Sequence, residues 1–237
     1  MTTPHMTGTS RRPIHRPLLI ACLLAAPAVL TVSELARLRV ESAHVESEDA
    51  VVDARSQLDA VAAQLPLWHL AAVLDLLFIL AWLGALLAAV LVVARTRPWA
   101  GLATGAVAVL SGLGLAMHNA FYYQALADLA GTPDHDQTAR VLAASGSDWL
   151  SAVALLVFFA GALLTPIVLG VSLWRAHALP WWAAAGLVLW LAGVFVGSEA
   201  TPAALVNLAL LLPFAAVARH LSEPSATDRQ ERRVSTP

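Results

Sequence analysis

Lysine is absent from this sequence, and charge of either sign is scarce. All 14 cationic side chains are arginine, and charged residues make up only 13% of the 237 residues, whereas 59% are hydrophobic. A soluble domain usually has about 25% charged and about 45–50% apolar residues. The deficit of charge therefore excludes an ordinary soluble domain and indicates a chain whose solvent is lipid.

Cysteine is almost absent, and so are the common catalytic motifs. The single cysteine, Cys22, excludes an intramolecular disulfide and a cysteine-based metal site. A chain without lysine has no P-loop, and the sequence contains no GxGxxG, GxSxG, HExxH or EF-hand pattern. Its longest basic runs are the pairs 11–12 and 232–233. We therefore expect no cofactor, no metal and no nucleic-acid partner, and these absences favour a protein that is not an enzyme.

What the sequence has in abundance is long apolar stretches, each near or above the roughly 20 residues that a membrane-crossing helix needs. They predict an all-α polytopic membrane protein, a single domain over residues 17–219. The tail 1–16 precedes this domain, and a polar tail at 220–237 follows it, which we expect to be disordered. The six predicted spans are residues 17–33, 67–94, 99–124, 149–174, 180–197 and 202–219.

The first apolar stretch, residues 17–33, has two interpretations. It could be a signal peptide, since Ala26-Pro27-Ala28 resembles a cleavage site. We favour a retained first helix, because the five helices that follow need an anchored start.

Arginine is distributed unevenly along the predicted topology. If the first helix leaves the cytoplasm, ten arginines fall on the cytoplasmic side and four on the other, namely Arg37, Arg39, Arg55 and Arg140. This is the positive-inside bias. Six tryptophans at predicted helix ends agree with it, since indole rings prefer the membrane surface: Trp68, Trp99, Trp149, Trp174, Trp181 and Trp182. The pattern predicts a plasma (inner) membrane protein with both termini in the cytoplasm.

Residues 34–66, between the first two spans, are polar and acidic but follow a helical period. Val51, Ala54, Leu58, Val61 and Leu65 form one apolar stripe. The segment is therefore predicted to be an extracytoplasmic helical segment. Its stripe either packs on the protein's own surface, which we favour, or docks a ligand or protein partner. Residues 125–147, between the third and fourth spans, are predicted to be a polar loop.

Asp75 is the only acid inside an apolar stretch, and a charge at the centre of a span costs roughly 2.5–3.5 kcal/mol on insertion scales. The second and third spans are joined by a turn centred between residues 96 and 97. His118 follows that turn by as many residues as Asp75 precedes it, so both lie at one depth. We predict that Asp75 and His118 approach one another within hydrogen-bond or one-water reach. The same symmetry places His69 level with Gln124.

Other polar residues lie at or near this level and define a candidate pocket open to the extracytoplasmic side. The inner half of the spans is much less polar. The pocket either joins helices, binds a ligand or lipid headgroup, holds a metal or proton for chemistry, or serves transport, and we favour the structural role. Its candidate residues are Asp75, His118, His69, Asn119, Tyr122 and Asn207.

Residues 168–194 comprise a helix end, an arginine-containing inner turn and a following helix. This pattern resembles bacterial six-helix membrane proteins known only as a domain of unknown function. The resemblance implies an N-terminal helix, an extracytoplasmic helical segment and five further spans. It implies no activity and no catalytic residues.

These observations favour an integral membrane protein of structural or accessory role that binds a ligand or partner from the extracytoplasmic side. The alternative is an intramembrane enzyme or proton-coupled transporter that uses Asp75 and His118.

Overall fold

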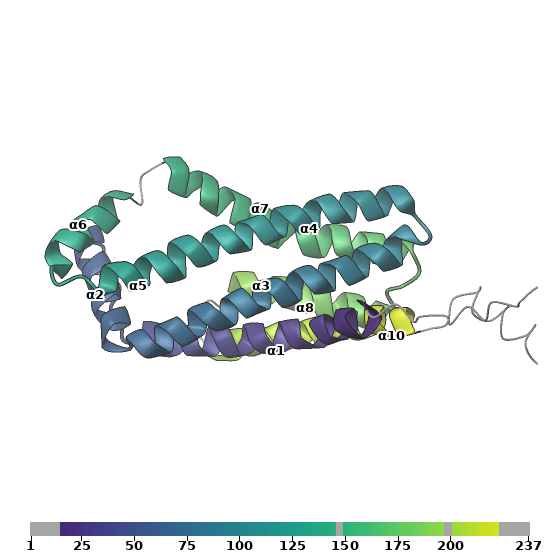
Figure 1. Cartoon of the computed structure of the whole chain (residues 1–237), viewed down its shortest axis with the longest axis horizontal. Helices are drawn as coiled ribbons and strands as arrows, with labels where there is room; N and C mark the ends of the chain where they lie inside the picture. Colours follow the sequence, from purple (N-terminus) through teal and green to yellow (C-terminus); the bar gives the residue numbers. More distant parts are fainter. Residues whose placement is uncertain (1–14, 146–148, 197–200, 223–237) are drawn as a thin grey trace, which may run out of the picture.

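The computed structural model describes residues 15–145, 149–196 and 201–222. Every regular element in these ranges is helical, which confirms the predicted all-α class (Figure 1). The elements are α1 (His15–Glu41), α2 (Ala50–Ala63), α3 (Leu65–Ala94), α4 (Pro98–His118), the π-helix η1 (Asn119–Gln124), α5 (Ala125–Ala130), α6 (His135–Ser145), α7 (Trp149–Arg175), α8 (Trp181–Val196), α9 (Thr201–Val206), the 3₁₀-helix η2 (Asn207–Leu210) and α10 (Leu211–Ser222).

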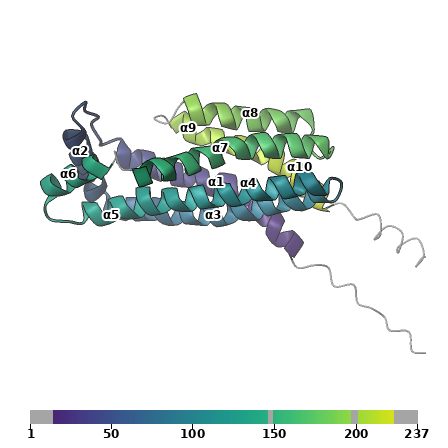
Figure 2. The same ribbon diagram turned by 90° about the horizontal axis from the view of Figure 1, so that it is seen from above.

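Five helical stretches of the described chain are long and apolar enough to cross a membrane. These are Arg16–Glu41, Leu65–Ala94, Pro98–Ala130, Ala152–Arg175 and Ala204–Ser222. The predicted fifth span, residues 180–197, corresponds to α8, whose apolar stretch Trp181–Gly193 is shorter. The long stretches lie side by side in one elongated bundle (Figures 1 and 2).

The two ends of the bundle differ. One end, here called the cap end, carries α2 and α6, and α5 reaches it as the continuation of the α4 helix (Figure 1). The other, here called the arginine end, contains the start of α1, the turn between α3 and α4, the end of α7 and the end of α10 (Figure 1). Its arginines are Arg16, Arg95, Arg97, Arg175 and Arg219.

Helix α1 packs along α3, and its first half buries an apolar stripe in the core. Leu19, Leu23 and Ala26 are buried one to two turns apart in this stripe. A Cβ built on Gly84 of α3 would lie 2.5 Å from the sulfur of Cys22. The two helices therefore approach closely where a glycine meets a small side chain, which is how helices associate in lipid.

Helices α4 and α7 make a similar close contact. A Cβ on Gly114 would lie 2.8 Å from the Cα of Phe158, and a Cβ on Gly161 would lie 2.8 Å from the Cα of Ser111. Real Cβ atoms essentially never come this near, so both contacts need glycine. The sequence analysis did not single out these two glycines.

The cap end corrects two of the predicted boundaries. The segment 34–66 is not a separate unit, because α1 continues helically to Glu41 and α3 already begins at Leu65. Residues 125–147 are not a plain loop, because α5 and α6 occupy most of the described part of them. The stripe of α2 packs on the protein itself: Ala54, Leu58 and Val61 are buried, whereas Val51 is exposed.

Trp68 is a third correction. We expected it at a membrane surface with the other helix-end tryptophans, yet it is fully buried and its indole Nε1 donates to the carbonyl of Tyr123 at 2.9 Å. Trp99, Trp174 and Trp181 are strongly exposed, as the prediction requires. The side chain of Trp149 and most of the predicted tails, residues 1–16 and 220–237, lie outside the described residues.

Candidate functional site

A charged cluster near the cap end of α1 is centred on Arg37. Its Nη2 donates to Glu34 at 2.6 Å, its Nε donates to the same oxygen at 3.1 Å, and its Nη1 donates to Glu41 at 2.6 Å. The side-chain exposures are 18% for Arg37, 28% for Glu34 and 21% for Glu41, so water reaches the cluster only in part. The helix places these residues on one face, because they are three and four positions apart.

Tyr122 ties this cluster to the third long stretch. Its hydroxyl donates to Glu41 through the carboxylate oxygen that Arg37 does not bond. Tyr122 belongs to the π-helix Asn119–Gln124, whose wider turns change the direction of its side chains relative to those of an α-helix. The neighbouring Tyr123 points into the core and is 1% exposed. Such π-helical turns are rare, and they occur frequently at functional sites.

Asp75 is buried, with 5% exposure, and its partner is Asn119. The Asn119 amide Nδ2 donates to the Asp75 carboxylate at 2.9 Å and to the Ala72 carbonyl at 3.1 Å. The depth argument therefore identified the correct level but not the correct partner. Among the hydrogen bonds of the described residues none joins Asp75 to His118, because Asn119 is the residue at this level whose side chain faces α3.

His118 instead lies in an aromatic stack. Its ring is 5.0 Å from that of Tyr122 at 13° and 4.5 Å from that of Phe158 of α7 at 18°.

The Arg37 cluster and Asp75 lie near the cap end of the apolar part of the bundle. Asp75 precedes the end of α3 at Ala94 by nineteen residues, which corresponds to about 28 Å at the rise of an α-helix. A bilayer has a hydrocarbon core of about 30 Å. Asp75 is therefore separated from the arginine end by almost a full membrane thickness.

Two candidates from the sequence lie elsewhere. His69 is exposed. Asn207 is buried and accepts a hydrogen bond of 3.0 Å from the indole Nε1 of Trp190 on α8. Trp82 makes a similar bond of 3.0 Å to the Ser111 hydroxyl, and its ring lies 5.9 Å from that of Trp190. These polar groups toward the arginine end are thus already paired.

The sequence analysis missed Glu34, Arg37 and Glu41. Their spacing was visible in the sequence, but we placed residues 34–66 outside the membrane as one external unit, so their charges did not need an explanation. In the described chain no group of three or more His, Cys, Asp or Glu side chains could hold a metal ion.

The cap end carries a second polar region, made by α2 and α6. His135 Nδ1 lies 2.7 Å from an Asp59 carboxylate oxygen, and Arg55 bonds Asp136. The bond to Asp59, followed by the Ala130 carbonyl near the other ring nitrogen, raises the pKa of His135 above its ordinary value.

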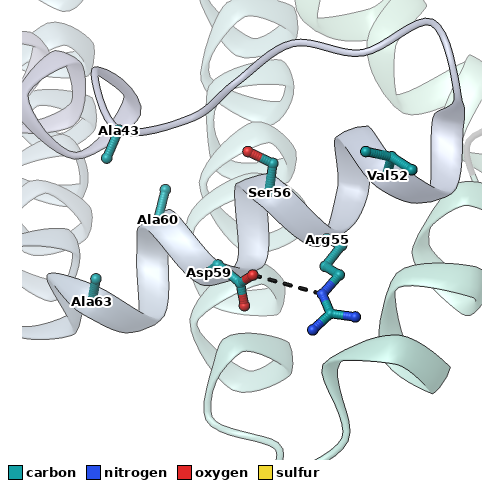
Figure 3. A pocket seen from close by; sticks show the side chains of 7 residues that line it. All are labelled: Ala43, Val52, Arg55, Ser56, Asp59, Ala60 and Ala63. Atoms are coloured by element: carbon teal, nitrogen blue, oxygen red, sulfur yellow. Dashed lines mark ion pairs between the residues drawn. The ribbon is translucent and has the colours of Figure 1, made fainter.

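Beside these ion pairs lies an open pocket of about 410 Å³ on α2 (Figure 3). Arg55 and Asp59 form an ion pair of 3.7 Å at its edge. The rest of its lining is small or aliphatic, apart from one hydroxyl: Ala43, Val52, Ser56, Ala60 and Ala63.

Comparison of this chain with protein-family models, with curated proteins and with solved structures gives no match.

Proposed function

We propose that this chain is a multi-pass protein of a bacterial inner membrane, with six spans, cytoplasmic termini and an extracytoplasmic cap end. The arginine count and the five long apolar helices support this topology. The remaining crossing, the fifth in chain order, would be α8, whose sixteen residues extend about 24 Å. A bilayer accommodates a short span by local thinning.

The proposed role is structural or accessory rather than enzymatic. The observation that carries it is the mutual pairing within the Arg37 cluster: one guanidinium binds two carboxylates, and Tyr122 donates to one of them. Polar side chains paired between helices hold membrane bundles together. The cluster joins α1 to the π-helical turn, and the neighbouring Asp75–Asn119 bond joins that turn to α3.

A ligand or protein partner would bind from the extracytoplasmic side. The open pocket on α2 supports this part of the proposal, since it lies within residues 34–66 and has one ion pair in a largely apolar lining.

A second candidate function is an intramembrane enzyme or proton-coupled transporter that uses Asp75 and His118. One observation favours it: the Asp75 carboxylate is buried, with 5% exposure, and its hydrogen-bond partner is the neutral Asn119 amide rather than a cation, so a proton could be held there. Two observations oppose it. His118 is stacked between two rings, and Ser111 and Asn207, nearer the arginine end, are hydrogen-bonded to tryptophans. Thr165 is the buried hydroxyl of the described residues that has no such partner.

The topology is tested by cysteine accessibility. In a Cys22→Ala background, we expect a membrane-impermeant maleimide to label Val52→Cys and Val141→Cys on intact cells. Both valines are exposed at the cap end, with 54% and 59% exposure. Thr96→Cys, at the arginine end, should react only after permeabilisation. Labelling of Thr96→Cys on intact cells would overturn the orientation.

The choice between the two functions is tested with purified protein in liposomes that contain a pH-sensitive dye. We expect wild type to pass no more protons than protein-free vesicles. The double variant Asp75→Leu/His118→Phe should behave the same and should remain folded, because Asn119 keeps its bond to Ala72. The control Asp128→Leu/His69→Phe changes the same residue types at exposed positions. Proton flux in wild type and the control that is lost in the double variant would establish the second candidate instead.

A further inference from the structure

The arginine end carries positive charge at Arg95, Arg97 and Arg175, and none of its described residues is acidic. Residues 15–33, 76–127, 149–196 and 201–222 contain neither Asp nor Glu. All described carboxylates therefore lie elsewhere along the chain, in α1 beyond residue 33, at Asp75, or in the cap end. Arg95, Arg97 and Arg175 are all exposed.

The end of α7 explains why two of these arginines come together. His177 has a φ of 56°, and the amides of His177 and Ala178 donate to the carbonyls of Trp174 and Leu173. This is the Schellman arrangement of a helix C-terminus. It leaves the carbonyl of Arg175 without a backbone partner in the motif.

Arg97, in the turn between α3 and α4, supplies that partner. Its Nε donates to the Arg175 carbonyl at 3.0 Å. The bond holds the Arg97 side chain against the residue that carries another guanidinium, and Arg95 is two positions away in the same turn. Like charges held near one another repel, and no ion pair of the described residues involves any of these three arginines. An anion bound among the three arginines would offset this repulsion.

Exposed tryptophans flank the same three arginines. Trp99 follows the turn and is 84% exposed, and Trp174 precedes Arg175 and is 67% exposed. Indole rings prefer the headgroup level of a bilayer. A guanidinium binds phosphate through two parallel N–H bonds, and basic sites between helix ends on the cytoplasmic side bind anionic headgroups.

We propose that the phosphate of an anionic phospholipid binds between the α3–α4 turn and the end of α7, held by Arg97, Arg175 and Arg95, with Trp99 and Trp174 at its sides. The site goes beyond the proposed function. It requires helices that cross a bilayer, but it does not depend on a role for the Arg37 cluster or for the pocket on α2.

Native mass spectrometry of the purified full chain tests this proposal, with phosphatidylglycerol and phosphatidylcholine as probes. We expect wild type to bind phosphatidylglycerol more tightly than phosphatidylcholine. Each arginine removed should weaken phosphatidylglycerol binding about fivefold, so Arg97→Gln/Arg175→Gln should lose about 25-fold. Arg140→Gln, an exposed arginine of the cap end, is the matched control and should bind like wild type.

Other outcomes would overturn the proposal. Equal binding of phosphatidylglycerol by wild type and the double variant would do so, as would an equal loss in Arg140→Gln. Inorganic phosphate that binds as tightly as the lipid would assign the site to a free anion. If the double variant does not fold, Arg95→Gln serves in its place, since no hydrogen bond described for this end uses the Arg95 side chain. Labelling of Thr96→Cys from outside would refute the proposed orientation but would leave this binding result intact.

Discussion

At the scale of single residues, Arg37 decides whether the charges of α1 stabilise or destabilise the bundle. It separates two carboxylates that lie within 2.6 Å of its nitrogens. Removal of one member of a poorly hydrated ion-pair network leaves an uncompensated charge, which costs about 3 kcal/mol. The same network can be replaced as a whole by uncharged side chains at little cost.

We therefore expect Arg37→Leu to lower the thermal unfolding midpoint in detergent by roughly 6–12 °C, on the scaling for a protein of this length. The triple variant Glu34→Gln/Arg37→Leu/Glu41→Gln should recover most of this loss. Arg39→Leu is the matched control, because Arg39 is exposed two positions further along the same helix. Equal midpoints for Arg37→Leu and Arg39→Leu would show that the cluster is not structural.

The residue scale also shows what sequence reasoning could reach. Helix rise and the position of the turn were enough to bring residue 75 level with residues 118 and 119. They did not fix rotation about the helix axis, and the π-helical turn that begins at Asn119 changes that rotation further. The choice of Asn119 over His118 as the partner of Asp75 therefore needed coordinates.

At the scale of helix pairs, the contact of α4 with α7 depends on two glycines. Adding side-chain atoms to a well-packed contact costs about 1–3 kcal/mol. Gly114→Val should lower the thermal midpoint accordingly, because its Cβ would meet the backbone of Phe158. Gly105→Val, nine residues earlier on the same helix, should have little effect, since a Cβ there meets nothing within 4 Å. A larger loss for Gly105→Val than for Gly114→Val would contradict the packing described above.

The contact of α2 with α6 is expected to depend on pH through His135. Its pKa is raised in the folded protein, so protonated His135 stabilises the contact. This contribution is complete below the ordinary histidine pKa of about 6.5 and is lost as pH rises through the raised value. The groups that face it are Asp59 and Arg55 on α2 and Asp136 on its own helix.

Spin labels at Val52→Cys and Val141→Cys, in a Cys22→Ala background, report on this contact. Their distance distribution should be narrow at pH 5.5 and broader at pH 8.5. In the His135→Gln variant the distance distribution should not change over this pH range. The His44–Asp53 pair at the other end of α2 is still present in that variant. A wild-type distribution that is the same at both pH values would refute the dependence.

Sequence patterns identified helices better than they identified helix boundaries. Periodicity in residues 51–65 correctly indicated α2 and its buried stripe, because that stripe packs on the protein itself. The end of α1 was placed too early, since charge was taken to mark the end of the span. The helix instead continues through residues 34–41, where Glu34, Arg37 and Glu41 pair with one another along one face.

At the scale of the whole molecule, α1 is part of the core and not an appendage of it. Leu19, Leu23 and Ala26 are buried, and Leu19 and Leu23 belong to the same core as Trp82 and Phe214. Cleavage after Ala28 would remove all three α1 residues. It would expose the α3 face that meets Cys22, and it would separate Arg37 from its membrane helix.

We therefore expect this first helix to be retained in the membrane. An epitope tag placed before residue 1 should remain on the purified protein, and intact mass spectrometry should find the full chain of 25.0 kDa plus the tag. A control with a strong signal peptide and cleavage site in place of residues 1–28 should lose the tag and melt at a lower temperature or fail to accumulate. Loss of the tag from the unaltered chain, with a mass that begins near residue 29, would mean that the remaining helices fold without the first half of α1. The packing of Leu19, Leu23 and Ala26 would then have no structural role in the mature protein, which would keep the Arg37 cluster.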